Sequence, residues 1–117
     1  MKTVLIADDS AMMRRLIRKI VTKHGYDIVG EATNGKMAVE MYKELRPDVV
    51  TLDMVMDEMT GLEALAEILK ENPDVNAIMI SSMGQDVIVR DAIELGAKNF
   101  LLKPFNEQEV MEAFNKL

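Results

Sequence analysis

The chain has 117 residues, of which 49% are hydrophobic and 29% charged, a balance typical of one folded domain rather than of a disordered chain. Its formal net charge of −6 argues against nucleic acid as a direct partner, because a phosphate backbone is bound by basic surfaces. The absence of cysteine excludes disulfides and thiolate metal sites and fits a reducing compartment.

The chain opens with a predicted strand followed by a predicted helix. Residues 3–7 form a short apolar run typical of a buried strand, which ends at Asp8 and Asp9. Ser10 is suited to cap the helix that follows, and Gly25 is suited to end it. This helix carries apolar residues at three- and four-residue spacing, namely Met13, Leu16, Ile17, Ile20 and Val21.

A second unit of the same kind follows. Residues 28–32 predict a strand, and Asn34-Gly35 turns the chain into a helix. Pro47 marks the end of this helix, because proline cannot continue it. The apolar positions of the helix are Met37, Met41 and Leu45.

The third and fourth units bring polar residues to the ends of strands. Residues 49–52 predict a strand that delivers Asp53, and residues 77–80 predict one that ends at Ser81-Ser82. The helix between them opens at Gly61, and its apolar face is predicted to be Leu62, Leu65, Ile68 and Leu69. The helix after the fourth strand carries Val87, Ile88, Ala92 and Ile93 and is closed by Gly96.

The last unit consists of a short strand and a helix. Residues 100–102 predict the fifth strand, which ends at Lys103-Pro104. Asn106 and Glu109 have the spacing of a capping box for the final helix. Five alternating units with near-continuous apolar strands predict an α/β fold, a doubly wound five-stranded parallel sheet with helices on both faces, in one domain over residues 1–117.

No targeting segment is expected, because Asp8 follows Met1 too closely to leave room for a signal peptide. No apolar run approaches the roughly 20 residues of a membrane span. We therefore expect a soluble, cytoplasmic protein that does not bind membranes.

Polar residues gather at four of the predicted strand ends: Asp8 and Asp9, Asp53, Ser81 and Lys103. Any one of them could be an ordinary turn, cap or surface residue. The carboxyl ends of parallel strands meet at one edge of the sheet, however, so these residues are expected to line one site.

The chemistry of these side chains predicts a cation-assisted phosphoryl acceptor. Three carboxylates repel one another unless cations balance them, and Lys103 supplies one positive charge. A site of oxygen ligands suits Mg²⁺, and a carboxylate such as Asp53 can accept a phosphoryl group. Mg²⁺, Lys103 and the hydroxyl of Ser81 would then stabilise the charge on the transferred group.

Competing motifs give little support to other chemistry. No phosphate-binding glycine loop follows any strand, which argues against nucleotide binding. The single histidine, His24, rules out a histidine-cluster metal site and is interpreted as a helix-end residue.

Four motifs together resemble the receiver family of two-component signalling, and within it the single-domain chemotaxis regulators of the CheY type. They are V-L-I-A-D-D-S, P-D-V-V-T-L-D-M, I-M-I-S-S-M-G and G-A-K-N-F-L-L-K-P-F, each at the spacing of the family. The resemblance covers essentially the whole chain, and it implies a flavodoxin-like sheet with strand order 2-1-3-4-5.

The resemblance also implies roles for individual residues. Asp53 matches the phosphoacceptor, and the Mg²⁺ ligands would be Asp8 (through water), Asp9, Asp53 and the backbone carbonyl of Val55. Lys103 matches the lysine that pairs with the phosphate, and a cis peptide is implied between Lys103 and Pro104. The two switch residues would be Ser81, whose hydroxyl moves to the phosphoryl group, and Phe100, which either turns inward on activation or is a plain core residue.

Four positions differ from the family pattern or distinguish this chain within it. Asp57 stands where a proline is usual, which should loosen the loop and add negative charge near the metal. Phe100 replaces the frequent tyrosine and so lacks its hydroxyl. Val55 and Met83 are apolar where the family controls the approach of water, so the phosphoryl group is expected to be long-lived.

These features predict a single-domain response regulator that is monomeric and is not itself an enzyme beyond its own phosphorylation. Implied partners are a CheA-like histidine kinase as phosphodonor, a flagellar or archaellar motor switch or adaptor protein, and a phosphatase. One alternative is a phosphorelay intermediate that passes the phosphoryl group to another histidine. An aspartyl-phosphate phosphatase of the haloacid-dehalogenase kind is disfavoured, because it would need an aspartate at the position of Val55. A receiver cut from a longer regulator is the remaining alternative, although the chain from Met1 to the last helix favours a complete protein.

Overall fold

Five parallel strands form a central sheet in the order β2-β1-β3-β4-β5. The fold is that of a computed structural model, which describes residues 2–82 and 86–117. The strands are β1 (Thr3–Ala7), β2 (Asp27–Ala32), β3 (Val49–Asp53), β4 (Asn76–Ser81) and β5 (Asn99–Leu102). The helices are α1 (Ala11–Lys23), α2 (Gly35–Leu45), α3 (Gly61–Glu71), α4 (Asp86–Leu95) and α5 (Glu107–Asn115). The predicted doubly wound architecture and strand order are confirmed.

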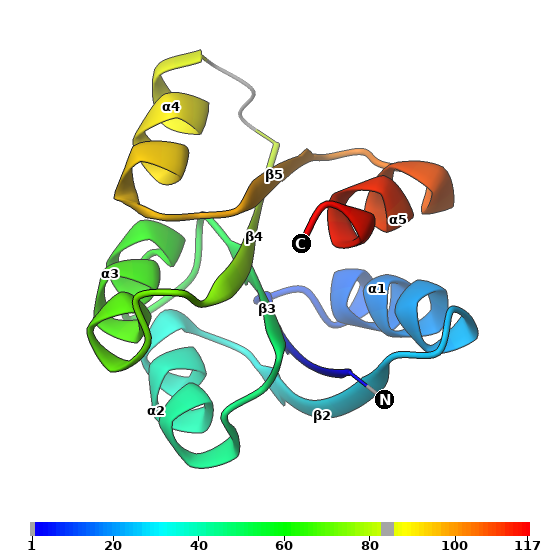
Figure 1. Ribbon diagram of the computed structural model, residues 1–117, viewed down its shortest axis with the longest axis horizontal. Coiled ribbons are helices and arrows are strands. Elements are labelled where there is room, and N and C mark those ends of the chain that lie inside the picture. The colour runs from blue at the N-terminus through cyan, green and yellow to red at the C-terminus, as the bar shows by residue number, and fades with distance from the viewer. Residues whose placement is uncertain (1, 83–85) are drawn as a thin grey trace.

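Helices cover both faces of the sheet, with α1 and α5 on one side and α2, α3 and α4 on the other (Figure 1). Side chains alternate across a strand, so β1 contributes to two separate cores. Val4 and Ile6 pack on the side of α1 and α5, whereas Leu5 and Ala7 pack on the side of α2 and α3. This double burial is the reason that the strands read as continuous apolar runs.

Two strands extend one residue further toward the site than the apolar pattern predicts. Asp53 is the last residue of β3 and is in register with Ile80, and Ser81 is the last residue of β4 and is in register with Leu102. Both polar residues are therefore part of the hydrogen-bonded sheet rather than of the loops after it.

The predicted helix starts are confirmed at Ser10, Asn34 and Asn106, whose side chains accept the hydrogen bonds of N-caps. The capping box formed by Thr60 and Glu63 at the start of α3 was not predicted, although its T-x-x-E spacing is a recognised signal. The cap at Ser10, for example, lets α1 begin directly after Asp8 and Asp9.

The buried face of α2 differs from the predicted apolar stripe. Met37 and Leu45 are each 37% exposed, while the residues fully enclosed by the core are Ala38 and Tyr42. The third predicted position, Met41, is partly buried against the core, so the predicted stripe and the buried face overlap there. Among the described helices, none has the length and apolar character that a membrane crossing requires.

Candidate functional site

Three carboxylates meet at the carboxyl edge of the sheet. Asp8 and Asp9 follow β1, Asp53 ends β3, and one carboxylate oxygen from each lies within 4.8 Å of the others. The two strands are neighbours, which brings residues 45 positions apart into one cluster. Asp8 and Asp53 are only 1% and 5% exposed, whereas Asp9 faces solvent. The predicted convergence of these three side chains is confirmed.

Lys103 lies between the two buried carboxylates. Its Nζ is 3.2 Å from Oδ2 of Asp8 and 3.5 Å from Oδ2 of Asp53. The Lys103-Pro104 peptide is cis, as expected, and the main-chain N–H of Lys103 donates to the carbonyl of Ser81 at 2.7 Å. This ammonium group thus contacts two of the three carboxylates, and its single charge leaves the group of Asp8, Asp9, Asp53 and Lys103 negative when all three carboxylates are ionised.

The electrostatics of the site act most strongly on Asp53. Burial and the charge of Asp8 raise the pKa of Asp53 to about 6, even though Lys103 and the main-chain N–H of Val55 lower it. The positive charge of Lys103 therefore does not compensate the negative charge around it. A cation bound between the carboxylates would relieve this repulsion.

The donor set fits Mg²⁺. It consists of carboxylate oxygens from three residues, with no nitrogen or sulfur donor among them, and hard divalent cations prefer oxygen ligands. Asp9, the exposed member, leaves the cluster open to solvent on one side, which suits an ion that retains several waters.

The remaining predicted site residues have different surroundings. Ser81 is buried at the end of β4, and Phe100 in β5 is partly buried against the core on the side of α2, α3 and α4. The side chain of Val55 is 63% exposed, and Met83 lies outside the described residues. The roles of these four residues in coordination, switching and water exclusion stay predictions.

The loop after β3 passes close to the start of α2. The main-chain carbonyl of Asp57 accepts hydrogen bonds from the N–H groups of Met59 at 2.7 Å and of Gly35 at 3.4 Å. Glu58, between Asp57 and Met59 in the chain, has a φ of 68°, a left-handed conformation that is uncommon for residues other than glycine. These bonds connect the loop to α2 without the proline that the family usually has.

Sequence reasoning missed one side chain in contact with the site loop. Arg14 of α1 donates from Nη1 to the main-chain carbonyl of Asp8 at 2.7 Å and from Nε to Glu31 of β2 at 3.1 Å. In the sequence Arg14 is one of several basic residues of a predicted helix. Only its position in the first turn of that helix, close to Asp8 and Asp9, could have drawn attention to it.

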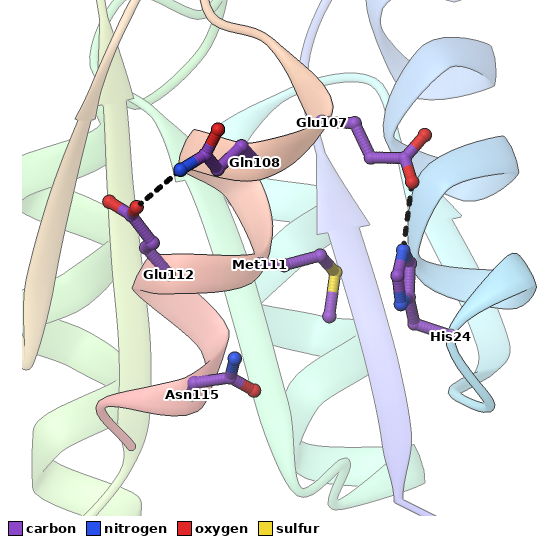
Figure 2. A pocket seen from close by; sticks show the side chains of 6 residues that line it. All are labelled: His24, Glu107, Gln108, Met111, Glu112 and Asn115. Atoms are coloured by element: carbon purple, nitrogen blue, oxygen red, sulfur yellow. Dashed lines mark hydrogen bonds and ion pairs between the residues drawn. The ribbon is translucent and has the colours of Figure 1, made fainter.

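His24 lies apart from the acidic cluster. It is the C-cap of α1, as expected, and its Nε2 is 2.9 Å from Oε2 of Glu107 at the start of α5. Figure 2 shows this pair at the edge of a hollow whose lining comes from the end of α1 and from α5. No predicted site residue lines this hollow.

The fold and the site together define a receiver-type α/β domain, in which an acidic cluster and a lysine share the carboxyl edge of a 2-1-3-4-5 sheet. The family model described as "Response regulator receiver domain" matches residues 4–115. The chain belongs to this family.

Similar proteins place the chain within the family. It is 53% identical to the chemotaxis protein CheY of Thermotoga maritima over 99% of this chain and 97% of the relative. It is 50% identical to CheY of Bacillus subtilis, over 97% and 94% of the two chains. A solved complex of CheX and CheY with BeF3 and Mg from Borrelia burgdorferi contains a chain that is 35% identical over 97% of this chain and 86% of its own length, with a TM-score of 0.94. The chain is therefore a response regulator of the CheY type, as the motifs implied.

Proposed function

We propose that the chain is a phosphorylation switch in which Asp53 accepts a phosphoryl group from a phosphohistidine of a CheA-like kinase. One observation carries this proposal: a buried carboxylate at a strand end, with two further carboxylates and Lys103 within reach of it. The names of the chemotaxis relatives support the setting.

Asp53 is the nucleophile in the proposed step. One of its carboxylate oxygens attacks phosphorus, the new P–O bond forms as the P–N bond to the donor imidazole breaks, and the donor nitrogen keeps the electron pair. With a pKa of about 6, Asp53 is mostly ionised at neutral pH and hence competent to attack.

The neighbours of Asp53 would bind and orient the group. Asp8, Asp9, Asp53 and the carbonyl of Val55 would hold Mg²⁺, which supplies positive charge at the phosphoryl oxygens. Lys103 would turn from Asp8 and Asp53 to a phosphoryl oxygen, and the hydroxyl of Ser81 would donate to another. The movement of Ser81 would let Phe100 turn inward, a shift between two populated states of one fold.

The proposed partners follow from the chemotaxis relatives. They are the kinase, a flagellar or archaellar motor switch or adaptor protein, and a phosphatase; the CheY of the Borrelia complex is bound to CheX. The regulator is proposed to act as a monomer in the cytoplasm, and its output depends on the phosphorylated state.

Phosphorylation of the variant Asp53→Asn tests the proposal. With acetyl phosphate or phosphorylated kinase in Mg²⁺, wild type should take up label stoichiometrically and the variant should take up none. Asp27→Asn, which removes an exposed carboxylate at the start of β2, should label like wild type. Label retained by Asp53→Asn, or lost equally in both variants, would contradict the assignment.

A further inference from the structure

Arg14 links the loop that carries Asp8 and Asp9 to strand β2. Its guanidinium donates to the main-chain carbonyl of Asp8 at 2.7 Å and to Oε1 of Glu31 at 3.1 Å. The side chain is charged, yet it is only 14% exposed. Its guanidinium group is therefore stabilised by these hydrogen bonds rather than by water.

Glu31 fixes the other end of this link. It lies in β2, next to β1, and also accepts from Arg18, whose Nη2 is 2.7 Å from Oε2 of Glu31. Both carboxylate oxygens of Glu31 are thereby engaged by arginines, one on each. Arg14 cannot turn away from the Asp8 carbonyl without breaking its bond to a carboxylate that is itself held in place.

The carbonyl that Arg14 contacts belongs to the peptide between two of the proposed metal ligands. The same residue, Asp8, also donates its main-chain N–H to Ala32 and accepts at Oδ1 from the N–H of Ser10. Rotation of the Asp8–Asp9 peptide would change the direction in which the Asp9 carboxylate points, and Arg14 is the side chain that opposes this rotation.

We infer that Arg14 is a positioning residue for the metal site, held by Glu31, and that it sets the affinity for Mg²⁺ through the orientation of the Asp8–Asp9 peptide. The inference rests on the proposed function, since it concerns the same site. Partners outside the direct ligand shell commonly change metal affinity by roughly 10- to 100-fold.

The direction in which the Mg²⁺ affinity changes distinguishes a positioning role of Arg14 from an effect of its charge alone. Arg14 is a cation beside an acidic cluster, so its removal should strengthen Mg²⁺ binding if only charge matters. If Arg14 orients the ligands, its removal should weaken binding instead. Glu31→Gln would be less decisive, because loss of a negative charge and loss of positioning both predict weaker binding.

The experiment is calorimetric titration of Mg²⁺ into wild type, Arg14→Met and Arg15→Met at one pH and ionic strength. Methionine keeps most of the apolar stem and removes the charge and the donors. Arg14→Met is expected to raise the Kd for Mg²⁺ roughly tenfold. Arg15→Met, which removes an exposed charge next to it on α1, is expected to leave the Kd unchanged or lower it.

An unchanged or lower Kd in Arg14→Met, or an equal increase in both variants, would overturn the inference. Failure of wild type to bind Mg²⁺ would instead overturn the proposed function, so the two failures are distinguishable. Thermal unfolding in chelator reports whether each variant is folded. If Arg14→Met does not fold, Arg14→Lys replaces it: lysine keeps the charge but has one nitrogen for the two acceptors, and weaker binding is again expected.

Discussion

At the scale of single residues, Asp53 combines burial with a like charge beside it. Both raise its pKa to about 6 from the ordinary value of 3.8. Between these two pH values the folded protein holds a proton that the unfolded chain has lost, so the free energy of unfolding falls as the pH rises through this range. Near neutral pH, the ionised carboxylate therefore opposes folding, although the proposed phosphorylation requires it.

Asp53→Asn should make the metal-free protein more stable at neutral pH. The expected gain in the free energy of unfolding is about 1–3 kcal/mol, since each pKa unit corresponds to about 1.4 kcal/mol. The gain should disappear as the pH falls below the ordinary aspartate range, where wild-type Asp53 is protonated in both states. Urea unfolding in chelator across this pH range measures it; parallel stability curves for the two proteins would refute the argument.

Thr51 is a second residue of β3 that lowers the free energy of unfolding, because a polar group of its side chain is buried without a partner in the described part of the chain. Its hydroxyl is buried, and no hydrogen-bond partner for it exists among the residues that the structure describes. Thr51→Val replaces the hydroxyl with a methyl group of similar size and should raise the free energy of unfolding by about 1 kcal/mol or more. Equilibrium urea unfolding is the measurement, and a destabilised variant would indicate that the hydroxyl has a partner after all.

At the scale of secondary structure elements, helix α3 starts against the end of β3. A Cβ on Gly61 would collide with the carbonyl of Asp53 and would lie 2.9 Å from Cα of Met54. The main-chain N–H of Gly61 donates to the carbonyl of Met54 at 3.0 Å. The absence of a side chain at this position thus allows the loop after Asp53 to fold back on the strand.

Gly61→Ala should destabilise the protein by about 1–3 kcal/mol, the usual cost of overpacking, although alanine favours helix by about 1 kcal/mol. Gly30→Ala is the matched comparison, because the three atoms nearest to a Cβ there belong to the side chains of Met41, Leu45 and Leu5. Flexible methionine and leucine ends can shift, so a smaller loss is expected. Urea denaturation of both variants measures the two losses in the free energy of unfolding. Equal losses would mean that the main chain of Asp53 yields to a Cβ as readily as flexible side chains do.

At the scale of the whole molecule, the acidic cluster exists only in the folded state. A metal ion that binds there stabilises the fold by an amount that grows with the logarithm of its concentration, about 2.7 kcal/mol at a hundred times the Kd. The melting temperature of wild type should consequently rise with Mg²⁺ and fall back with chelator.

Asp9→Asn should reduce this Mg²⁺-dependent increase, because it removes one of three carboxylate ligands. Asp27→Asn, which changes an exposed aspartate at the start of β2, should retain it. Thermal scans at increasing Mg²⁺ concentration give the comparison. An equal increase in both variants would show that the stabilisation comes from ions at the surface in general.

Much of the fold was predictable from local features of the chain. The apolar runs, the caps at Ser10 and Asn106 and the breaks at Gly25 and Pro47 determine where strands and helices begin and end, because backbone hydrogen bonding and side-chain periodicity act over a few residues. The placement of acidic residues at strand ends likewise predicted one shared site, since parallel strands end at the same edge.

Only the tertiary structure decided how those residues meet. Three contacts join different secondary structure elements. Lys103 lies between Asp8 and Asp53, Arg14 donates to the carbonyl of Asp8, and Gly61 packs against the end of the strand that carries Asp53. They depend on the distance and angle at which helices pack on the sheet, which no local pattern of residues specifies. The sequence by itself therefore determined the elements and the chemistry at their ends, while the packing of those elements decided the distances and burial that raise the pKa of Asp53 and hold the site loop.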